Sequence, residues 1–474
     1  MRYMFLCLAL AGCMVGPDYN KPEAPASPAF KELAGWKIVH PADSAAKGTW
    51  WSVYRDPELD RLETMVAVSN QTIKQFEAQY RNAEAQVAVA RSSLFPAVGL
   101  GVGAARNGGG AGSVSSLSHS ATQYNTTGSA AWDLDVWGRI RRQVESSTAA
   151  AQVSAADLAN AQLSAQATLA VDYFDLRAED ALGQLLDQTA AAYQRALDIT
   201  QNQYRAGTAS SIDYVTALAQ LQSVQATAVA VGVQRQQYEH AIALLTGHAP
   251  SDLTIAPAPL ASDVPVLPPG LPSALLERRP DIASAERTMQ QENALIGVAI
   301  AAYYPDISLS VLGEYAGYPL SQLISASNQI WSLGAAGNEV LYNGGLRAAD
   351  VVAARANYDT AVAAYRQTVL TAFQQVEDAL SSLRILEQQA RAEAIAVDST
   401  SRAVEATLNA YRAGTVVYTS VITEQALLLS DQQAALAVQQ SRLVASVSLI
   451  EALGGGWTTD DLPQTIETIS PLTP

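Results

Sequence analysis

The segment Tyr204-Arg205-Ala206-Gly207-Thr208 recurs 207 residues later as Tyr411-Arg412-Ala413-Gly414-Thr415, in a chain of 474 residues. Each copy interrupts a long segment that is rich in alanine and glutamine and contains no proline. Glycine is the residue that most readily ends a helix through a left-handed turn. Polar residues follow each glycine and can cap a returning helix, at Ser210–Asp213 and Tyr418–Ser420. A five-residue identity at matching places argues against chance resemblance, so we predict a duplicated unit with helical hairpin tips near residues 207 and 414.

The overall composition excludes several classes of protein. The net charge is −16 and the isoelectric point is near 4.7, which disfavours a nucleic-acid partner. Hydrophobic residues make up 49% of the chain, and many of them are alanines, which suit close helix packing. Beyond the first dozen residues no run of eighteen apolar residues occurs, so no membrane-spanning helix is expected.

The N-terminus has the pattern of an export signal. Arg2 precedes a short apolar stretch that ends in Leu10-Ala11-Gly12-Cys13, which matches the lipobox of bacterial lipoproteins. We predict that residues 1–12 are removed and that Cys13 becomes an acylated N-terminus, which attaches the chain to a membrane without a spanning helix. The alternative is a buried N-terminal strand. Because Cys7 is the only other cysteine, no intramolecular disulfide is expected in the mature chain.

An extended arm is predicted for residues 13–55, since four prolines fall between Pro22 and Pro41. After the arm, Asp56 can cap a helix that has Pro57 at its first position. This helix is predicted to run to about Leu94 and to stop before Phe95-Pro96.

Two stretches change from helical to strand periodicity. Large apolar residues alternate with small or polar ones in the predicted hairpins 97–137 and 305–342. The alternating apolar positions include Val98, Leu100, Val102, Trp132, Leu134, Ile307, Leu309, Val311, Trp331 and Leu333. Paired strands of about ten residues fit membrane-spanning hairpins, although a surface hairpin of a soluble domain would have a similar pattern.

A long helix follows each hairpin. The first is predicted from Gly138-Arg139 to Tyr204, which is about 100 Å at 1.5 Å per residue. The second keeps a 4-3 apolar spacing that is typical of a left-handed coiled coil, at Tyr358, Val362, Tyr365, Val369, Ala372, Val376, Ala379, Leu383, Leu386 and Ala390.

These elements define a mostly α-helical fold with a β-barrel part and an internal repeat. The repeats are predicted at 56–249 and 273–455, with a linker at 250–272 and a tail at 456–474. Four strands cannot close a barrel, and unpaired edges are unfavourable in lipid. Several chains must therefore contribute strands, and a homotrimer would provide about twelve, within the known range of such barrels.

The ordered set of motifs resembles the TolC/OprM/NodT family of outer-membrane efflux lipoproteins. The resemblance extends from Cys13 to about Gly456 and rests on Leu10–Cys13, Gly16–Tyr19, Trp132–Arg139, Glu277–Ile282, Tyr304-Pro305, Asn343–Gly345 and both Tyr-Arg-Ala-Gly-Thr segments.

The resemblance implies a trimeric outer-membrane channel with a helical tunnel that extends into the periplasm. Its implied partners are a periplasmic adaptor (membrane fusion protein) and an inner-membrane pump, commonly of the resistance-nodulation-division type. The implied function is the passive passage of drugs or other toxic small molecules to the exterior, without catalysis and without a cofactor apart from the lipid on Cys13.

In the family, the helical tips form the gate and the adaptor-docking surface. By resemblance, the corresponding residues are Arg205, Gly207, Thr208 and Asp213 in the first tip and Arg412, Gly414, Thr415, Tyr418, Ser420 and Thr423 in the second. Asp213 falls where relatives often carry a gate aspartate, but it could equally be a solvated acid that complements a helix dipole. The second tip has hydroxyls at Ser420 and Thr423 where relatives often carry acids.

Other functions have less support in the sequence. The four histidines, His40, His119, His240 and His248, lack metal-ligand spacing, and no nucleophile motif accompanies them, so neither an enzyme nor a metal site is expected. A structural coiled-coil envelope lipoprotein without a pore, and the outer component of a type I protein secretion system, remain as alternatives.

Overall fold

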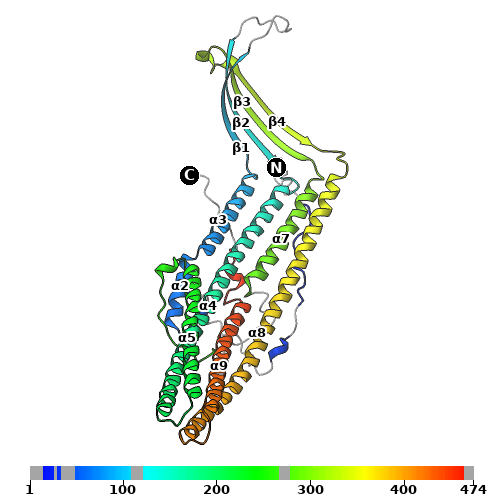
Figure 1. Ribbon diagram of the computed structural model, residues 1–474. Coiled ribbons are helices and arrows are strands. Elements are labelled where there is room, and N and C mark those ends of the chain that lie inside the picture. The colour runs from blue at the N-terminus through cyan, green and yellow to red at the C-terminus, as the bar shows by residue number, and fades with distance from the viewer. Residues whose placement is uncertain (1–13, 26–28, 34–48, 108–120, 266–277, 464–474) are drawn as a thin grey trace.

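The computed structural model describes residues 14–25, 29–33, 49–107, 121–265 and 278–463. The predicted signal 1–12, Cys13, parts of the arm and linker, His40, His119 and the tail from residue 464 lie outside this part of the chain. Within it, long helices form one elongated body, and a four-stranded sheet extends from one end of that body (Figure 1). The two helical tips lie at the opposite end.

The chain passes twice through the same order of elements: a helix, a β-hairpin, a 67-residue helix and a 35-residue returning helix. The first passage consists of α3 (Gln71–Ser92), β1 (Ala97–Asn107), β2 (Ala121–Leu134), α4 (Arg139–Arg205) and α5 (Ser211–Leu245). The second consists of α7 (Pro280–Ala301), β3 (Asp306–Gly317), β4 (Gln329–Asn338), α8 (Leu346–Arg412) and α9 (Tyr418–Ala452). Each 67-residue helix is about 100 Å long.

The helix predicted from Asp56 to about Leu94 is in fact two helices, α2 (Pro57–Ser69) and α3, so this prediction was wrong. Asp56 does cap α2, since its side chain accepts from the backbone N–H groups of Glu58 and Leu59. The break lies at Asn70, whose side chain accepts from Ile73 N at 3.0 Å and donates to Leu245 O at 2.8 Å. Asn70 therefore starts a new helix and also binds the end of α5, and only the second contact requires the tertiary structure.

The sheet is antiparallel in the order β1-β2-β3-β4. Val98 lies opposite Ala130, Ala130 opposite Val311, and Val311 opposite Leu333. Because directly opposed side chains share a face, the large apolar residues predicted from the alternation all lie on one face, as expected. The other face is mostly glycine, serine, threonine and alanine, and it carries the acids Asp133, Asp306 and Glu314.

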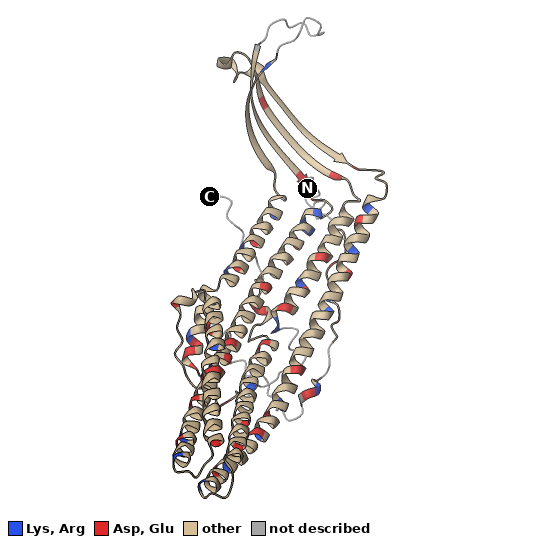
Figure 2. Ribbon diagram, viewed as in Figure 1, with Lys and Arg blue, Asp and Glu red and all other residues tan. Residues whose placement is uncertain are grey.

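The sheet has two open edges within the described residues, because β1 pairs only with β2 and β4 only with β3. Figure 2 shows charged residues along the helices and very few on the strands. An apolar face, a polar face and few charges are typical of strands in a membrane barrel.

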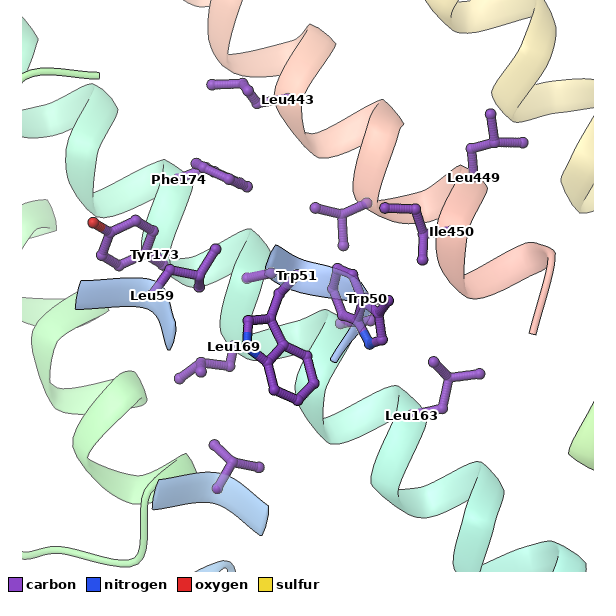
Figure 3. Packing of buried hydrophobic residues seen from close by; sticks show 14 of the residues in the cluster. Trp50, Trp51, Leu59, Leu163, Leu169, Tyr173, Phe174, Leu443, Leu449 and Ile450 are labelled. Carbon is purple, nitrogen blue, oxygen red and sulfur yellow. The ribbon is translucent and has the colours of Figure 1, made fainter. Parts of the chain in front are cut away.

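The main hydrophobic core lies midway along the helices. Trp50 and Trp51 of the short helix η2 (Trp50–Tyr54) pack among side chains of α2, α4 and α9 (Figure 3). The labelled partners there include Leu59, Leu163, Leu169, Leu449 and Ile450. The predicted α8 stripe is also buried, from Tyr365 through Val369 and Ala372 to Val376.

None of the helices in the described ranges combines the length and the apolar character that crossing a bilayer requires.

Candidate functional site

The two repeated segments form the same turn. Gly207 and Gly414 have φ values of +75° and +73°, the left-handed conformation that favours glycine. Gly207 N donates to Tyr204 O at 3.0 Å, and Gly414 N donates to Tyr411 O at 2.9 Å. These turns end α4 and α8 at Arg205 and Arg412, as the repeated sequence predicts.

The threonine after each glycine completes the helix end. The backbone N–H of Thr208 donates to Gln203 O at 2.9 Å, and its hydroxyl donates to the same carbonyl at 3.1 Å. Thr415 binds Ala410 O in the same way, at 3.0 Å through its N–H and 2.9 Å through its hydroxyl. At each tip, one carbonyl that the helix end would leave unpaired thus accepts two hydrogen bonds from the threonine.

The first returning helix begins with a reciprocal capping box. Ser210 Oγ accepts from Asp213 N at 3.1 Å, while the Asp213 carboxylate accepts from Ser210 N at 3.1 Å and lies 2.9 Å from Ser210 Oγ. Within one protomer the Asp213 carboxylate therefore serves the start of α5, where its charge also complements the helix dipole.

The second returning helix lacks such a cap. The residue before α9 is Val417, and the polar stretch Tyr418–Ser420, predicted to cap this helix, does not do so because the helix already begins at Tyr418. Ser420 N donates to Val417 O at 3.1 Å, and the Thr423 hydroxyl donates to Thr419 O at 3.0 Å. The backbone N–H of Ser420 and the hydroxyl of Thr423 therefore bind carbonyls at the start of their own helix.

The two tips of one chain are joined by aromatic side chains. Tyr411 donates its hydroxyl to Gln203 Oε1 at 2.5 Å, and its ring lies 5.2 Å from that of Tyr418. Tyr418 is only 2% exposed, within an apolar cluster that includes Leu197 and Val421, so its side chain is absent from the tip surface. Burial raises the pKa of Tyr418 to about 12, so its phenol stays protonated at an alkaline pH at which an exposed tyrosine would ionise.

The tip surface presents cations and apolar side chains. Arg205 and Arg412 are exposed at the last turns of α4 and α8, and Arg412 Nη1 also donates to Asn409 Oδ1 at 3.3 Å. Ile212 and Val417, which flank the turns, are also exposed. Guanidinium groups beside apolar side chains are suited to contact with another protein.

A second group of predicted motif residues forms the joint between the sheet and the helices. Asp135 caps α4, since its carboxylate accepts from Ile140 N and Arg141 N at 2.9 Å each. Trp137 donates its indole N–H to Pro305 O at 2.9 Å and stacks on Tyr304 at 4.7 Å. The Trp132–Arg139 motif thus connects the end of the first hairpin to the beginning of the second.

The N-terminal arm begins at this joint. Val15 N donates to Trp137 O at 3.1 Å, and the fully buried Arg142 donates to the carbonyls of Val15 and Gly16 at 3.2 Å each and to the Asp18 carboxylate at 2.9 Å. The residue that follows the predicted lipidation site, Met14, therefore lies at the end of the sheet nearest the helices.

Sequence reasoning missed several residues of these sites. Gln203 and Tyr411 could have been noticed because they lie inside or beside the repeated segment, whereas the contact between them depends on the fold. Arg142 had no sequence signal apart from its place in an arginine-rich helix start. In the described part of the chain, no group of three or more His, Cys, Asp or Glu side chains could hold a metal ion.

Comparison with known proteins places this architecture in a family. Residues 64–248 and 271–455 match the model of the outer membrane efflux protein family. The chain is 30% identical over 460 residues to the probable efflux pump outer membrane protein TtgC of Pseudomonas putida, covering 94% of this chain and 93% of that protein. It is 27% identical to the cation efflux system protein CusC of Escherichia coli, covering 95% and 97% of the two chains.

The fold comparison agrees with the sequence comparison. A solved structure of the outer-membrane channel OprN superposes with a TM-score of 0.87 at 28% identity, covering 94% of this chain and all of that one. The repeated tips, the four-stranded sheet with one apolar face, and these matches lead to one conclusion. The chain belongs to the outer membrane efflux protein family and is an efflux channel of the outer membrane.

Proposed function

We propose that three copies of the chain form a passive conduit through which an inner-membrane pump and a periplasmic adaptor expel small toxic molecules or drugs. One observation carries this proposal: a sheet with one apolar face and two open edges extends from helices about 100 Å long. Open edges are unfavourable in lipid, so closure by further copies stabilises the sheet. The names of the relatives, an efflux pump outer membrane protein and a cation efflux system protein, support the transport class.

We further propose that Cys13 carries the lipid anchor. The next residues support this, because the arm begins at the joint between sheet and helices, where a membrane surface would lie. An acyl chain on Cys13 would add to the membrane attachment that the strands provide.

The tips are the proposed gate and adaptor-docking surface. The contact between Tyr411 and Gln203 and the cluster around Tyr418 hold the two hairpins of one chain together. Exposed Arg205 and Arg412 are available to acidic groups of the adaptor or of a neighbouring copy. An inner-membrane pump of the resistance-nodulation-division type is the proposed energy source.

A genetic experiment tests this function. Deletion of the gene should increase the susceptibility of its host to a panel of antibiotics, detergents and metal ions, and the full chain supplied in trans should restore resistance. A pump inhibitor should abolish the difference between the two strains. Unchanged susceptibility across the panel, in a host shown to produce the protein, would contradict an efflux role.

A further inference from the structure

We infer the register in which β4 of one copy pairs with β1 of the next: the numbers of facing residues add to 439. In this register, Glu339–Tyr342 extends β4 along its new partner. The inference rests on the proposed assembly and adds the residue pairs that join its subunits. It follows from the internal repeat, because the chain already contains one such seam, between β2 and β3.

The register follows from that internal seam. Facing residues of β2 and β3 have numbers that add to 441, from Tyr124 opposite Gly317 to Leu134 opposite Ile307. The long helices after β2 and β4 begin 207 residues apart, at Arg139 and Leu346. The first strands of the two hairpins begin 209 residues apart, at 97 and 306. Each β2 residue therefore corresponds to the β4 residue numbered 207 higher, and each β3 residue corresponds to the β1 residue numbered 209 lower. Because facing residues of β2 and β3 add to 441, facing residues of β4 and the partner's β1 should add to 439.

The chemistry of the two faces provides an independent check. On β1 the apolar face has even numbers, such as Val98 and Leu100, whereas on β4 it has odd numbers, such as Trp331 and Leu333. An odd sum joins apolar face to apolar face, and a shift by one residue would turn one strand over. The offsets that give 439 make no use of side-chain identity, yet they satisfy this condition.

The register also accounts for the segment after β4. Leu341 is 94% exposed and Tyr342 is 88% exposed, although both are large and apolar in character. In the inferred pairing Leu341 lies opposite Val98 of the partner subunit on the apolar face, and Tyr342 lies opposite Ala97 of the partner subunit. All 11 residues of β1 would then have a partner on their open side.

The same numbering offsets predict which residues of two neighbouring subunits correspond to the contact at the joint between the strands and the helices. Within the chain, Trp137 stacks on Tyr304 at the β2–β3 seam. Between copies, the corresponding positions are Gly344 and Phe95 of the partner subunit. Phe95 is 69% exposed in the single chain, and the seam would bring it beside Tyr342.

Cysteine pairs test the register in the full-length protein in membranes. Ala335→Cys with Ala104→Cys and Leu341→Cys with Val98→Cys, each pair adding to 439, should form interchain disulfides on mild oxidation, because directly opposed β-carbons are about 5 Å apart. Ala335→Cys with Val102→Cys adds to 437 and should react far more slowly, since diagonal neighbours are about 7–8 Å apart. Ala130→Cys with Val311→Cys, opposed within the chain, is the intrachain positive control, and the parent without added cysteines is the blank.

The outcomes separate the register from the assembly. Covalent dimers and trimers from the 439 pairs, with little from the 437 pair, support the inference. Faster reaction of the 437 pair in an otherwise intact oligomer would overturn the register and leave the proposed function in place. If no pair reacts between chains and no heat-resistant oligomer is found, while the intrachain control reacts, then the assembly itself is wrong and the register with it.

Discussion

Replacing Tyr411 by phenylalanine should open the channel without unfolding it. The substitution removes one hydroxyl, which donates to Gln203 Oε1 at 2.5 Å and connects the second tip to the first. The ring itself is only 8% exposed and stays packed against Tyr418, so the apolar cluster that joins the hairpins is retained.

The size of the effect follows from the hydrogen bond. A neutral hydrogen bond contributes about 0.5–1.5 kcal/mol to the state that contains it. Gln203 is half-buried, so water can partly replace the lost donor and the lower half of this range applies. If opening separates the tips, three copies together lose about 1.5–3 kcal/mol of closed-state stability, which increases the ratio of open to closed channels about 10-fold to 150-fold.

Single-channel recording in planar bilayers measures this ratio directly. The matched control is Tyr204→Phe, the same change at the corresponding position of the first tip, where the side chain is 46% exposed and stacks on Tyr214 at 5.9 Å. We expect longer and more frequent openings in Tyr411→Phe and wild-type behaviour in Tyr204→Phe, with equal amounts of heat-resistant oligomer. Equal open probabilities in the two variants would refute a locking role for the contact between Tyr411 and Gln203.

Three further predictions concern stability. Ser210→Ala should destabilise the start of α5 by about 1 kcal/mol, and Val417→Ser should stabilise the start of α9 by a similar amount. Amide hydrogen exchange at each tip measures both changes. If neither variant changes the exchange rates, the asymmetry in capping is contradicted. Asp180→Ala should lower the free energy of unfolding in urea by about 3 kcal/mol, because Asp180 accepts from the buried Arg177 at 3.0 Å; a change below about 1 kcal/mol would exclude this. Burial raises the pKa of Glu63 from 4.5 to about 9, so between these values the folded protein retains a proton that the unfolded chain loses. The free energy of unfolding should therefore fall as the pH rises from about 5 to 9, by up to about 1.4 kcal/mol per pH unit. Glu63→Gln should flatten this profile in thermal unfolding, and identical profiles would show that Glu63 does not titrate there.

Periodicity and turn chemistry made most of the fold predictable. The spacing of apolar residues along the chain is enough to predict the lengths of α4 and α8, the four strands and the apolar face of the sheet. The turns at Gly207 and Gly414 were predictable because their conformation depends on local sequence.

Features that depend on tertiary contacts were not predictable. The break at Asn70 depends on its contact with Leu245, 175 residues away. Helix α9 begins without a polar cap because the apolar cluster around Tyr418 holds its first turn, so a local capping argument failed there. Arg142 binds the arm 124 to 127 residues earlier in the chain, and no local pattern reveals such a contact.

The most direct test of the account is the conductance of the purified, full-length protein in planar bilayers. We expect discrete conductance steps from a folded, heat-resistant oligomer, with more open time in Tyr411→Phe. A folded oligomer that inserts into the membrane yet leaves it non-conducting, in both the wild type and Tyr411→Phe, would contradict the conclusion that this protein is a channel.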